Sequence, residues 1–135
     1  MKNNKKNALY QLFLAIVLLI SSSSFLQAQS FDNIADAIRS GNAASLASHF
    51  QGNVEISVKE SQNSYSKSQA EVVLRNFFGS HSPKSFAIAH QGSSPEGSKY
   101  FIGNLATNAG NYRTYVYAKL NGGNYSIQEI RFEEQ

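Results

Sequence analysis

The sequence predicts an α+β domain in which three N-terminal helices pack on a strongly curved antiparallel sheet, after a cleaved signal peptide. Three observations lead to this expectation. A long apolar run follows several lysines at the start of the chain. Apolar residues then recur at helical spacing as far as Phe78, and from Lys84 onward they alternate with polar residues. We therefore expect a signal peptide over residues 1–28 and a single domain over residues 29–135.

The leader has the three parts of a secretory signal peptide. Lysines give it a positive start, the stretch from Ala8 to Ile20 is almost wholly apolar, and Leu26-Gln27-Ala28 suits signal peptidase. An uncleaved membrane anchor is the alternative, but this run falls short of the roughly 20 residues of a stable membrane span. The chain has no cysteine to which a lipid could be attached. The sequence therefore predicts an exported, soluble protein, periplasmic or secreted.

The excess positive charge of the chain lies in this leader. The whole chain has 12 basic and 9 acidic residues, and Lys2, Lys5 and Lys6 are three of the basic ones. No acidic residue precedes Asp32, so cleavage leaves nine basic groups against nine acidic ones. A neutral domain without a basic cluster argues against nucleic-acid binding. The lack of cysteine also excludes thiolate zinc sites and cysteine nucleophiles.

Apolar spacing predicts a first helix that starts near Phe31 and ends at Gly41, where glycine suits a left-handed C-terminal cap. Asn42 then serves as the N-cap of a second helix, which reaches Phe50. A strand over residues 54–58 follows, because apolar and polar residues alternate there.

A polar loop over residues 60–64 precedes the third helix. Ser66 and Gln69 are spaced as a capping box, and Tyr65 is placed for a hydrophobic staple. The buried stripe of this helix consists of Ala70, Val73, Leu74, Phe77 and Phe78. The dipeptide Ser82-Pro83 ends it.

The rest of the chain predicts four consecutive antiparallel strands. Three turns connect them: Ser94-Pro95-Glu96-Gly97, Asn108-Ala109-Gly110-Asn111 and Asn121-Gly122-Gly123-Asn124. A two-residue loop at the last turn pairs Leu120 with Tyr125, and a four-residue loop over 108–111 pairs Gly103 with Val116. The alternation breaks near Gln128-Glu129, which predicts a β-bulge that curves the sheet.

This register divides the side chains between two faces of the sheet. The inner face, which the helices must cover, holds Phe86, Ile88, His90, Phe101, Leu105, Thr114, Val116, Ala118, Leu120, Tyr125 and Ile127. The outer face holds Tyr100, Ile102, Asn104, Arg113, Tyr115, Tyr117, Lys119 and Arg131. Tyrosines interleaved with positive charges form either a solvated face or a protein interface, whose candidates are Tyr100, Ile102, Arg113, Tyr115 and Tyr117.

Several segments resemble a known superfamily. They are Ala37-Ile38-Arg39-Ser40-Gly41-Asn42, Leu46-Ala47-Ser48-His49-Phe50, Gln69-Ala70-Glu71 and Phe77-Phe78. Together with the four-stranded meander, these segments are similar to the nuclear transport factor 2-like superfamily. The resemblance implies a cone, in which a bent sheet wraps helices and leaves a pocket at its wide end. It also implies dimers through the outer sheet surface.

A narrower resemblance is to secreted bacterial proteins of domain-of-unknown-function family 4783. It rests on Tyr65-Ser66-Lys67, Pro83-Lys84-Ser85-Phe86, His90-Gln91-Gly92, Lys99-Tyr100, Ile102-Gly103 and Gly110-Asn111-Tyr112-Arg113. This family implies no assigned activity, and a fold by itself does not imply one.

His90 is the sharpest candidate for a site, because the register places it on the inner face opposite Gly103, where room is left for an imidazole or a ligand. It is a structural histidine, a pocket-lining residue or an acid–base catalyst. The other pocket candidates are Gly103, Tyr112, Thr114 and Tyr125. His49 and His81 follow helices and are expected to be structural. The three histidines have no metal-ligand spacing, so no metal or cofactor is expected.

The leading hypothesis is an exported module that binds a small molecule or a peptide in the cone and pairs as a homodimer through the outer face. A small enzyme with a His90-centred acid–base site is the alternative, with Tyr112 or Tyr125 as polar helpers. The resemblance implies that enzymes of the superfamily place Asp, His or Tyr side chains deep in the cone. The only aspartates of this chain are Asp32 and Asp36, at the start of the first helix, so the pattern of those enzymes is not met. A third hypothesis is a non-catalytic accessory subunit of an envelope complex. Neither nucleic acid nor a membrane anchor after cleavage is expected.

Overall fold

The computed structural model describes residues 3–135, without the side chains of Asn3 and of residues 18–30. The helices are α1 (Asn3–Ser40), α2 (Ala43–Ala47) and α3 (Lys67–Ser80). The strands are β1 (Phe50–Val58), β2 (Ser61–Tyr65), β3 (Pro83–Ser93), β4 (Lys99–Thr107), β5 (Gly110–Asn121) and β6 (Asn124–Glu134). The predicted cleavage site at Leu26-Gln27-Ala28 lies outside the described side chains, as does Lys2.

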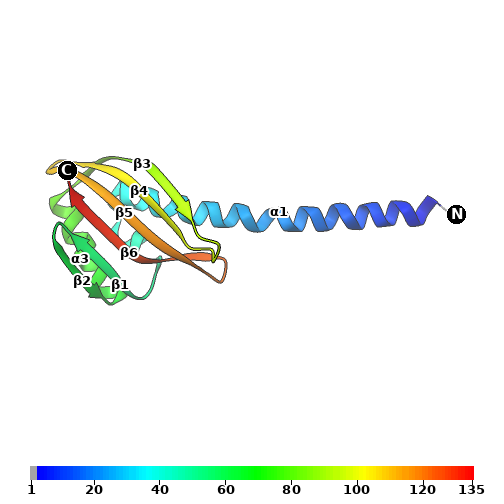
Figure 1. Cartoon of the computed structure of the whole chain (residues 1–135), viewed down its shortest axis with the longest axis horizontal. Helices are drawn as coiled ribbons and strands as arrows, with labels where there is room; N and C mark the ends of the chain where they lie inside the picture. Colours follow the sequence, from blue (N-terminus) through cyan, green and yellow to red (C-terminus); the bar gives the residue numbers. More distant parts are fainter. Residues whose placement is uncertain (1–2) are drawn as a thin grey trace.

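The N-terminal part of α1 projects away from a compact body formed by the rest of the chain (Figure 1). The predicted first helix is therefore the last part of a continuous helix, not a separate element. Among the residues described, α1 included, no helix has both the length and the hydropathy of a membrane span.

All six strands form one curved sheet in the order β2-β1-β6-β5-β4-β3. Every neighbouring pair is antiparallel except β1 and β6, which run parallel. The helices pack against the inner side of this sheet (Figure 1). The class is α+β as predicted, but two strands lie between the second and third helices.

The first two strands correct the sequence prediction. The second helix ends at Ala47, so Phe50 begins β1 instead of closing a helix. The predicted polar loop over 60–64 is mostly β2, an edge strand whose side chains are exposed apart from Tyr65. Hydrophobic periodicity cannot reveal such a strand, because neither of its faces is apolar.

The predicted helix caps are confirmed. Ser66 and Gln69 form the reciprocal capping box of α3. The side chain of Asn42 accepts a hydrogen bond from the Ser45 amide at the start of α2. Gly41 directly follows α1, and its φ of 66° makes it the left-handed C-terminal cap of this helix.

The predicted β5–β6 hairpin is also confirmed. Leu120 pairs with Tyr125, and both glycines of the turn have positive φ. Tyr117 pairs with Glu129, whereas Ala118 pairs with Ile127, so Gln128 is the extra residue of the predicted bulge. Beyond the bulge, Ile130 and Phe132 return to the inner face, where both are fully buried.

The β4–β5 register differs from the prediction by two residues. Gly103 pairs with Thr114, not with Val116, because the turn has two residues instead of four. The Thr107 hydroxyl closes this short turn, since it donates to the Gly110 carbonyl at 2.7 Å and accepts from the Ala109 amide. A shift of two residues preserves the inner and outer faces, so the predicted faces of these strands stand.

Aromatic rings dominate the core where α3 meets the sheet. The ring of Phe77 stacks on Phe132 of β6 with centroids 4.3 Å apart, and Phe78 meets Phe132 edge-on at 6.1 Å. Tyr112 of β5 meets Phe77 edge-on at 5.4 Å. These contacts fix α3 against the inner face.

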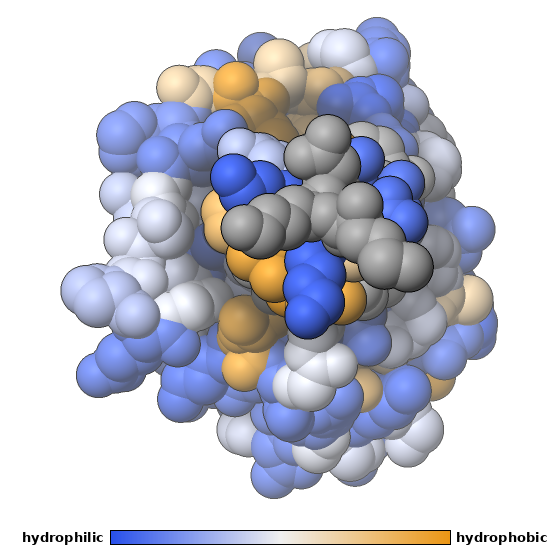
Figure 2. Space-filling model, turned by 90° about the vertical axis from the view of Figure 1, so that its right-hand side faces the viewer, coloured by the Kyte–Doolittle hydropathy of each residue, from blue (hydrophilic) through white to orange (hydrophobic). Residues whose placement is uncertain are grey.

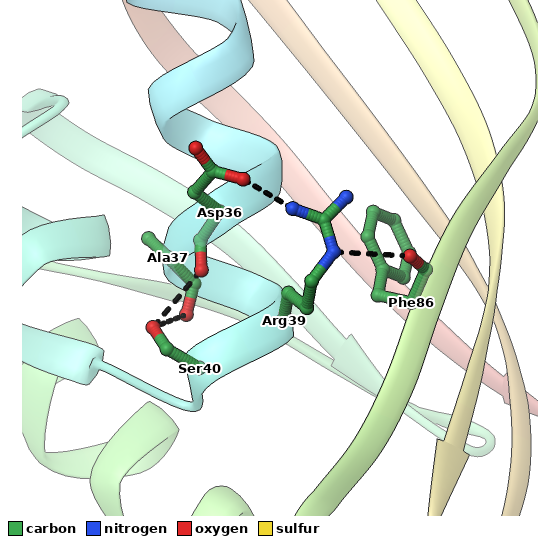
Figure 3. Close-up of polar contacts among 5 residues, drawn as sticks. All are labelled: Asp36, Ala37, Arg39, Ser40 and Phe86. Atoms are coloured by element: carbon green, nitrogen blue, oxygen red, sulfur yellow. Dashed lines mark hydrogen bonds and ion pairs between the residues drawn. The ribbon is translucent and has the colours of Figure 1, made fainter.

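Arg39 joins α1 to the free edge of the sheet (Figure 3). Its Nε donates to the carbonyl oxygen of Phe86 on the edge strand β3 at 3.3 Å, and its guanidinium pairs with Asp36 one turn earlier. A backbone group that faces the edge of β3 is thus satisfied by a side chain instead of another strand, which protects this edge from strand pairing.

Candidate functional site

His90 lies on the outer face, so the prediction that it faces the core is wrong. The β3–β4 register shifts by one residue after Ile88, and His90 therefore pairs with Ile102 of the outer face. Its side chain is exposed, and its Nε2 lies 3.2 Å from the Tyr100 hydroxyl. The shift brings the next residue, Gln91, to the inner side. A His90-centred acid–base site inside the cone is therefore excluded.

Gly103 leaves no room for a ligand, contrary to the prediction. A Cβ atom at this position would lie 2.4 Å from the Phe86 ring and 2.9 Å from the Ala87 carbonyl oxygen. The ring of Phe86, which is 4% exposed, fills the space above Gly103. Glycine is required here by close packing of the core.

Tyr112 and Thr114 are buried within the core of the sheet. Tyr112 is 1% exposed, and its ring meets the rings of Phe77 and His81 edge-on. Thr114 is fully buried, and its hydroxyl has no hydrogen-bond partner within the described residues. Both side chains face inward as predicted, but they meet neighbouring side chains there.

Tyr125, the remaining pocket candidate, lies beside a cleft at the end of the body from which α1 projects. We call this the entry cleft. It has a volume of about 230 Å³ and is lined by Phe31, Gln91, Gly92, Ser93 and Lys99. The rings of Phe31 and Tyr125 meet edge-on at 5.4 Å, and both are almost completely buried.

The ammonium group of Lys99 sits over these two rings. Its Nζ lies 5.7 Å from the ring centroid of Phe31 and 5.3 Å from that of Tyr125. Such contacts are attractive because the ring faces are negative. Figure 2 looks along α1 onto this end of the molecule, where the surface not covered by grey atoms is largely hydrophilic. The part of this surface in view is mostly hydrophilic, with apolar patches among the polar residues.

The outer face carries a connected group of aromatic side chains. Tyr100, Ile102, Tyr115 and Tyr117 are half-buried there, and we call them the outer tyrosine cluster; Arg113 beside them is exposed. The rings of Tyr100 and Tyr115 are 6.1 Å apart, and the guanidinium of Arg131 lies 5.0 Å from the Tyr115 centroid. All five predicted interface candidates thus share one face.

Glu129 forms an ion pair with Arg131 at the outer tyrosine cluster. Its carboxylate accepts from Arg131 at 2.6 Å, and this hydrogen bond raises the pKa of Arg131. Burial, with the negative charge of Glu129, raises the pKa of Tyr115. The Tyr115 hydroxyl therefore stays protonated at neutral pH and can donate a hydrogen bond to a partner.

The other two histidines belong to the packing of the helices. His81 stacks on Phe77 with centroids 4.6 Å apart, and His49 is half-buried between α2 and β1. Burial lowers the pKa of His49, so this residue favours the neutral form. In the described part of the chain, no three His, Asp or Glu side chains come together as metal ligands.

Comparison with protein families gives one match over almost the whole body. Residues 31–133 match the model of a domain of unknown function, DUF4783. The chain belongs to the DUF4783 family. None of the curated proteins matches it.

Solved structures place this DUF4783 domain among known folds. It is similar to a DUF4783 family protein from Bacteroides uniformis, with 27% identity and a TM-score of 0.73 over 77% of this chain and 95% of that one. A DUF4783 family protein from Bacteroides ovatus has 26% identity and the same TM-score, over 76% and 93% of the two chains.

More distant structures share the architecture. An NTF2-like protein of unknown function from Cytophaga hutchinsonii has 9% identity and a TM-score of 0.53, over 76% of this chain and 84% of that one. At this identity the likeness concerns the fold alone. It confirms that the DUF4783 domain has the curved-sheet architecture of NTF2-like proteins.

Sequence reasoning did not single out as site residues any of the five described residues that line the entry cleft: Phe31, Gln91, Gly92, Ser93 and Lys99. Phe31 was predicted only as the start of the first helix, and Gln91 and Gly92 were used only for the family resemblance. The sequence signal that could have indicated the cleft is Lys99. It begins the strand whose residue Phe101 faces inward, so its own side chain faces inward too, and its only acidic neighbour in the sequence is Glu96.

Proposed function

We propose that this DUF4783 domain is an exported, non-catalytic binding module that takes a small ligand in the entry cleft. One observation carries the proposal: a cation, an amide, a hydroxyl and an aromatic ring all line the same cleft of about 230 Å³. Binding sites typically combine apolar walls with a few such polar groups. The deeper candidates Gly103, Tyr112 and Thr114 are packed by neighbouring side chains, so the ligand is assigned to the end of the body instead of its centre.

Export agrees with the position of the cleft. Cleavage after Ala28 would make Phe31 the third residue of the mature chain. The mature protein would therefore keep the ring that lines the cleft, while the projecting part of α1 would be removed. The support for cleavage is the pattern of lysines, apolar residues and Leu26-Gln27-Ala28 in the leader.

The test is to purify the protein from the envelope of a bacterium that expresses it and to measure its intact mass before and after gentle denaturation. We expect a chain that begins at Gln29 and a small molecule that is released on unfolding. Ser93→Trp, which fills the cleft, should abolish co-purification of that molecule. Ser64→Trp on the exposed strand β2 is the matched control and should retain it. Retention by the Ser93 variant would rule out the entry cleft as the site.

Self-association through the outer tyrosine cluster is a second candidate, favoured by the charges that flank the cluster. Arg113 and Lys119 lie on β5, whereas Glu129 and Glu133 lie on the neighbouring strand β6. A second copy related by a twofold axis can set Arg113 and Lys119 of one chain against Glu129 and Glu133 of the other, where Arg131 between the two glutamates already pairs with both. Tyrosine and arginine are also enriched at the centre of protein interfaces.

Light scattering during size-exclusion chromatography tests this second candidate. We expect the unaltered protein to have the mass of a dimer and Tyr115→Glu to have that of a monomer, because the variant places a charge in the middle of the cluster. Ser64→Glu on β2 is the control and should remain dimeric. A monomer at high concentration of the unaltered protein would contradict the proposed interface.

A further inference from the structure

Lys99 gives the entry cleft a chemical preference. Within the described residues, no Asp or Glu oxygen lies within 4 Å of the Lys99 ammonium group. The contacts that this group makes there are with the ring faces of Phe31 and Tyr125. Ring faces attract a cation without accepting its three hydrogens in the directional way that oxygen does. Lys99 therefore retains the capacity to bind an anion.

The acidic residues nearest to the cleft in the sequence do not neutralise Lys99. Asp32 follows Phe31, and Glu96 lies in the turn before Lys99, but both are exposed and neither forms an ion pair with Lys99. Among the described side chains, the other polar groups that line the cleft are the Gln91 amide and the Ser93 hydroxyl, each of which can donate a hydrogen bond. One cation and two neutral donors thus surround the same space.

We infer that the group recognised in the entry cleft is a carboxylate, held by Lys99 with Gln91 and Ser93 as hydrogen-bond donors. This inference rests on the proposed function of the cleft. A carboxylate carries one negative charge and two acceptor oxygens, which matches a single lysine and two donors. A phosphate dianion would remain half-neutralised, because no other Lys or Arg lines the cleft among the residues whose side chains the structure describes.

The size of the cleft limits the rest of the ligand. A volume of about 230 Å³ corresponds to roughly seven or eight water molecules at about 30 Å³ each. It therefore admits the carboxylate with a short apolar tail beside Phe31, and the remainder of a longer ligand must lie outside. A small free acid and the C-terminal residue of a peptide share this chemistry.

The experiment uses the processed protein and two matched pairs of probes. Phenylacetate is compared with neutral phenylacetamide, and an acetylated dipeptide with a free C-terminus is compared with its amide. Binding is measured by calorimetry, and the amide NMR signals of Gln91, Gly92 and Ser93 report whether a probe occupies the cleft. Lys99→Met keeps the aliphatic stem over the rings but removes the charge. Lys67→Met at the exposed start of α3 is the control.

We expect at least one carboxylate probe to bind and to shift the NMR signals of the cleft. Its neutral partner should bind at least about tenfold more weakly. Lys99→Met should lose about the same factor, whereas Lys67→Met should bind normally. If only phenylacetate binds, the source is a free acid; if only the dipeptide binds, it is a chain terminus. Thermal unfolding of both variants shows whether the fold is intact.

Two outcomes would overturn the inference, and they differ in what they leave standing. Equal binding of the charged and neutral probes, or normal binding by Lys99→Met, would refute recognition of a carboxylate while shifts at Gln91–Ser93 still support the entry cleft. Absence of any shift with all four probes at millimolar concentration would also overturn it. In that case, co-purification that survives Ser93→Trp would show that the proposed function itself has failed.

Discussion

Replacement of Phe132 by alanine is expected to lower the free energy of unfolding by about 3–5 kcal/mol. Phe132 is fully buried, and its ring stacks on Phe77 with centroids 4.3 Å apart. Removing the ring leaves a cavity where α3 packs on β6, and the edge-on contact with Phe78 is lost as well. Since a domain of this size has a total stability of about 5–15 kcal/mol, the variant should be close to unfolding.

Urea unfolding of the processed protein, followed by circular dichroism, measures this effect. Val72→Ala is the matched control because Val72 lies on the same helix but is 49% exposed. The control should change the free energy of unfolding by no more than about 0.5 kcal/mol. A loss below about 1 kcal/mol for Phe132→Ala would mean that α3 does not depend on this ring for its position.

Replacement of Gly103 by alanine is expected to destabilise the protein by about 1–3 kcal/mol through overpacking. The new methyl group would lie 2.4 Å from the Phe86 ring and 2.9 Å from the Ala87 carbonyl oxygen. The ring can turn aside at some cost, but the carbonyl belongs to the neighbouring strand and moves only with its backbone. If the inner face were open at Gly103, the same substitution would be harmless.

A double-mutant cycle separates these two contacts. Phe86→Leu shortens the side chain above Gly103, so the double variant should be less destabilised than the sum of the two single variants. Gly79→Ala on α3 is the control, since a Cβ there meets nothing within 4 Å. It should raise stability by about 0.5–1 kcal/mol, because glycine is unfavourable inside a helix. Strict additivity at Gly103 and Phe86 would contradict the packing described here.

The parts of the fold that the sequence predicts well are those fixed by local chemistry. Ser66 and Gln69 form a capping box from their own spacing, and Gly122-Gly123 sets both the turn and the pairing of Leu120 with Tyr125. The strand β2 was missed because polar residues on both faces leave no periodic signal. The β4–β5 turn was misjudged because the Thr107 hydroxyl replaces part of a longer loop.

The candidate site was harder to predict because it depends on one residue of register. The irregularity between Ile88 and His90 turns His90 outward and Gln91 inward, and no residue type in Ala87-Ile88-Ala89 announces it. The sequence does show that Gly103 leaves a space on the inner face, because glycine has no side chain. Whether its space holds a ligand or the Phe86 ring is a matter of tertiary packing, which spacing along one strand does not reveal.

The parallel pairing of β1 with β6 has a consequence for the order of events during folding. Glu55 of β1 pairs with Glu129 of β6, so an early strand finds its central neighbour only in the last strand of the chain. Contacts of such high sequence separation form late, because a long loop must be closed first. If the chain crosses a membrane from its N-terminus, β1 and β5 cannot be joined into one sheet before the last strand, β6, has passed.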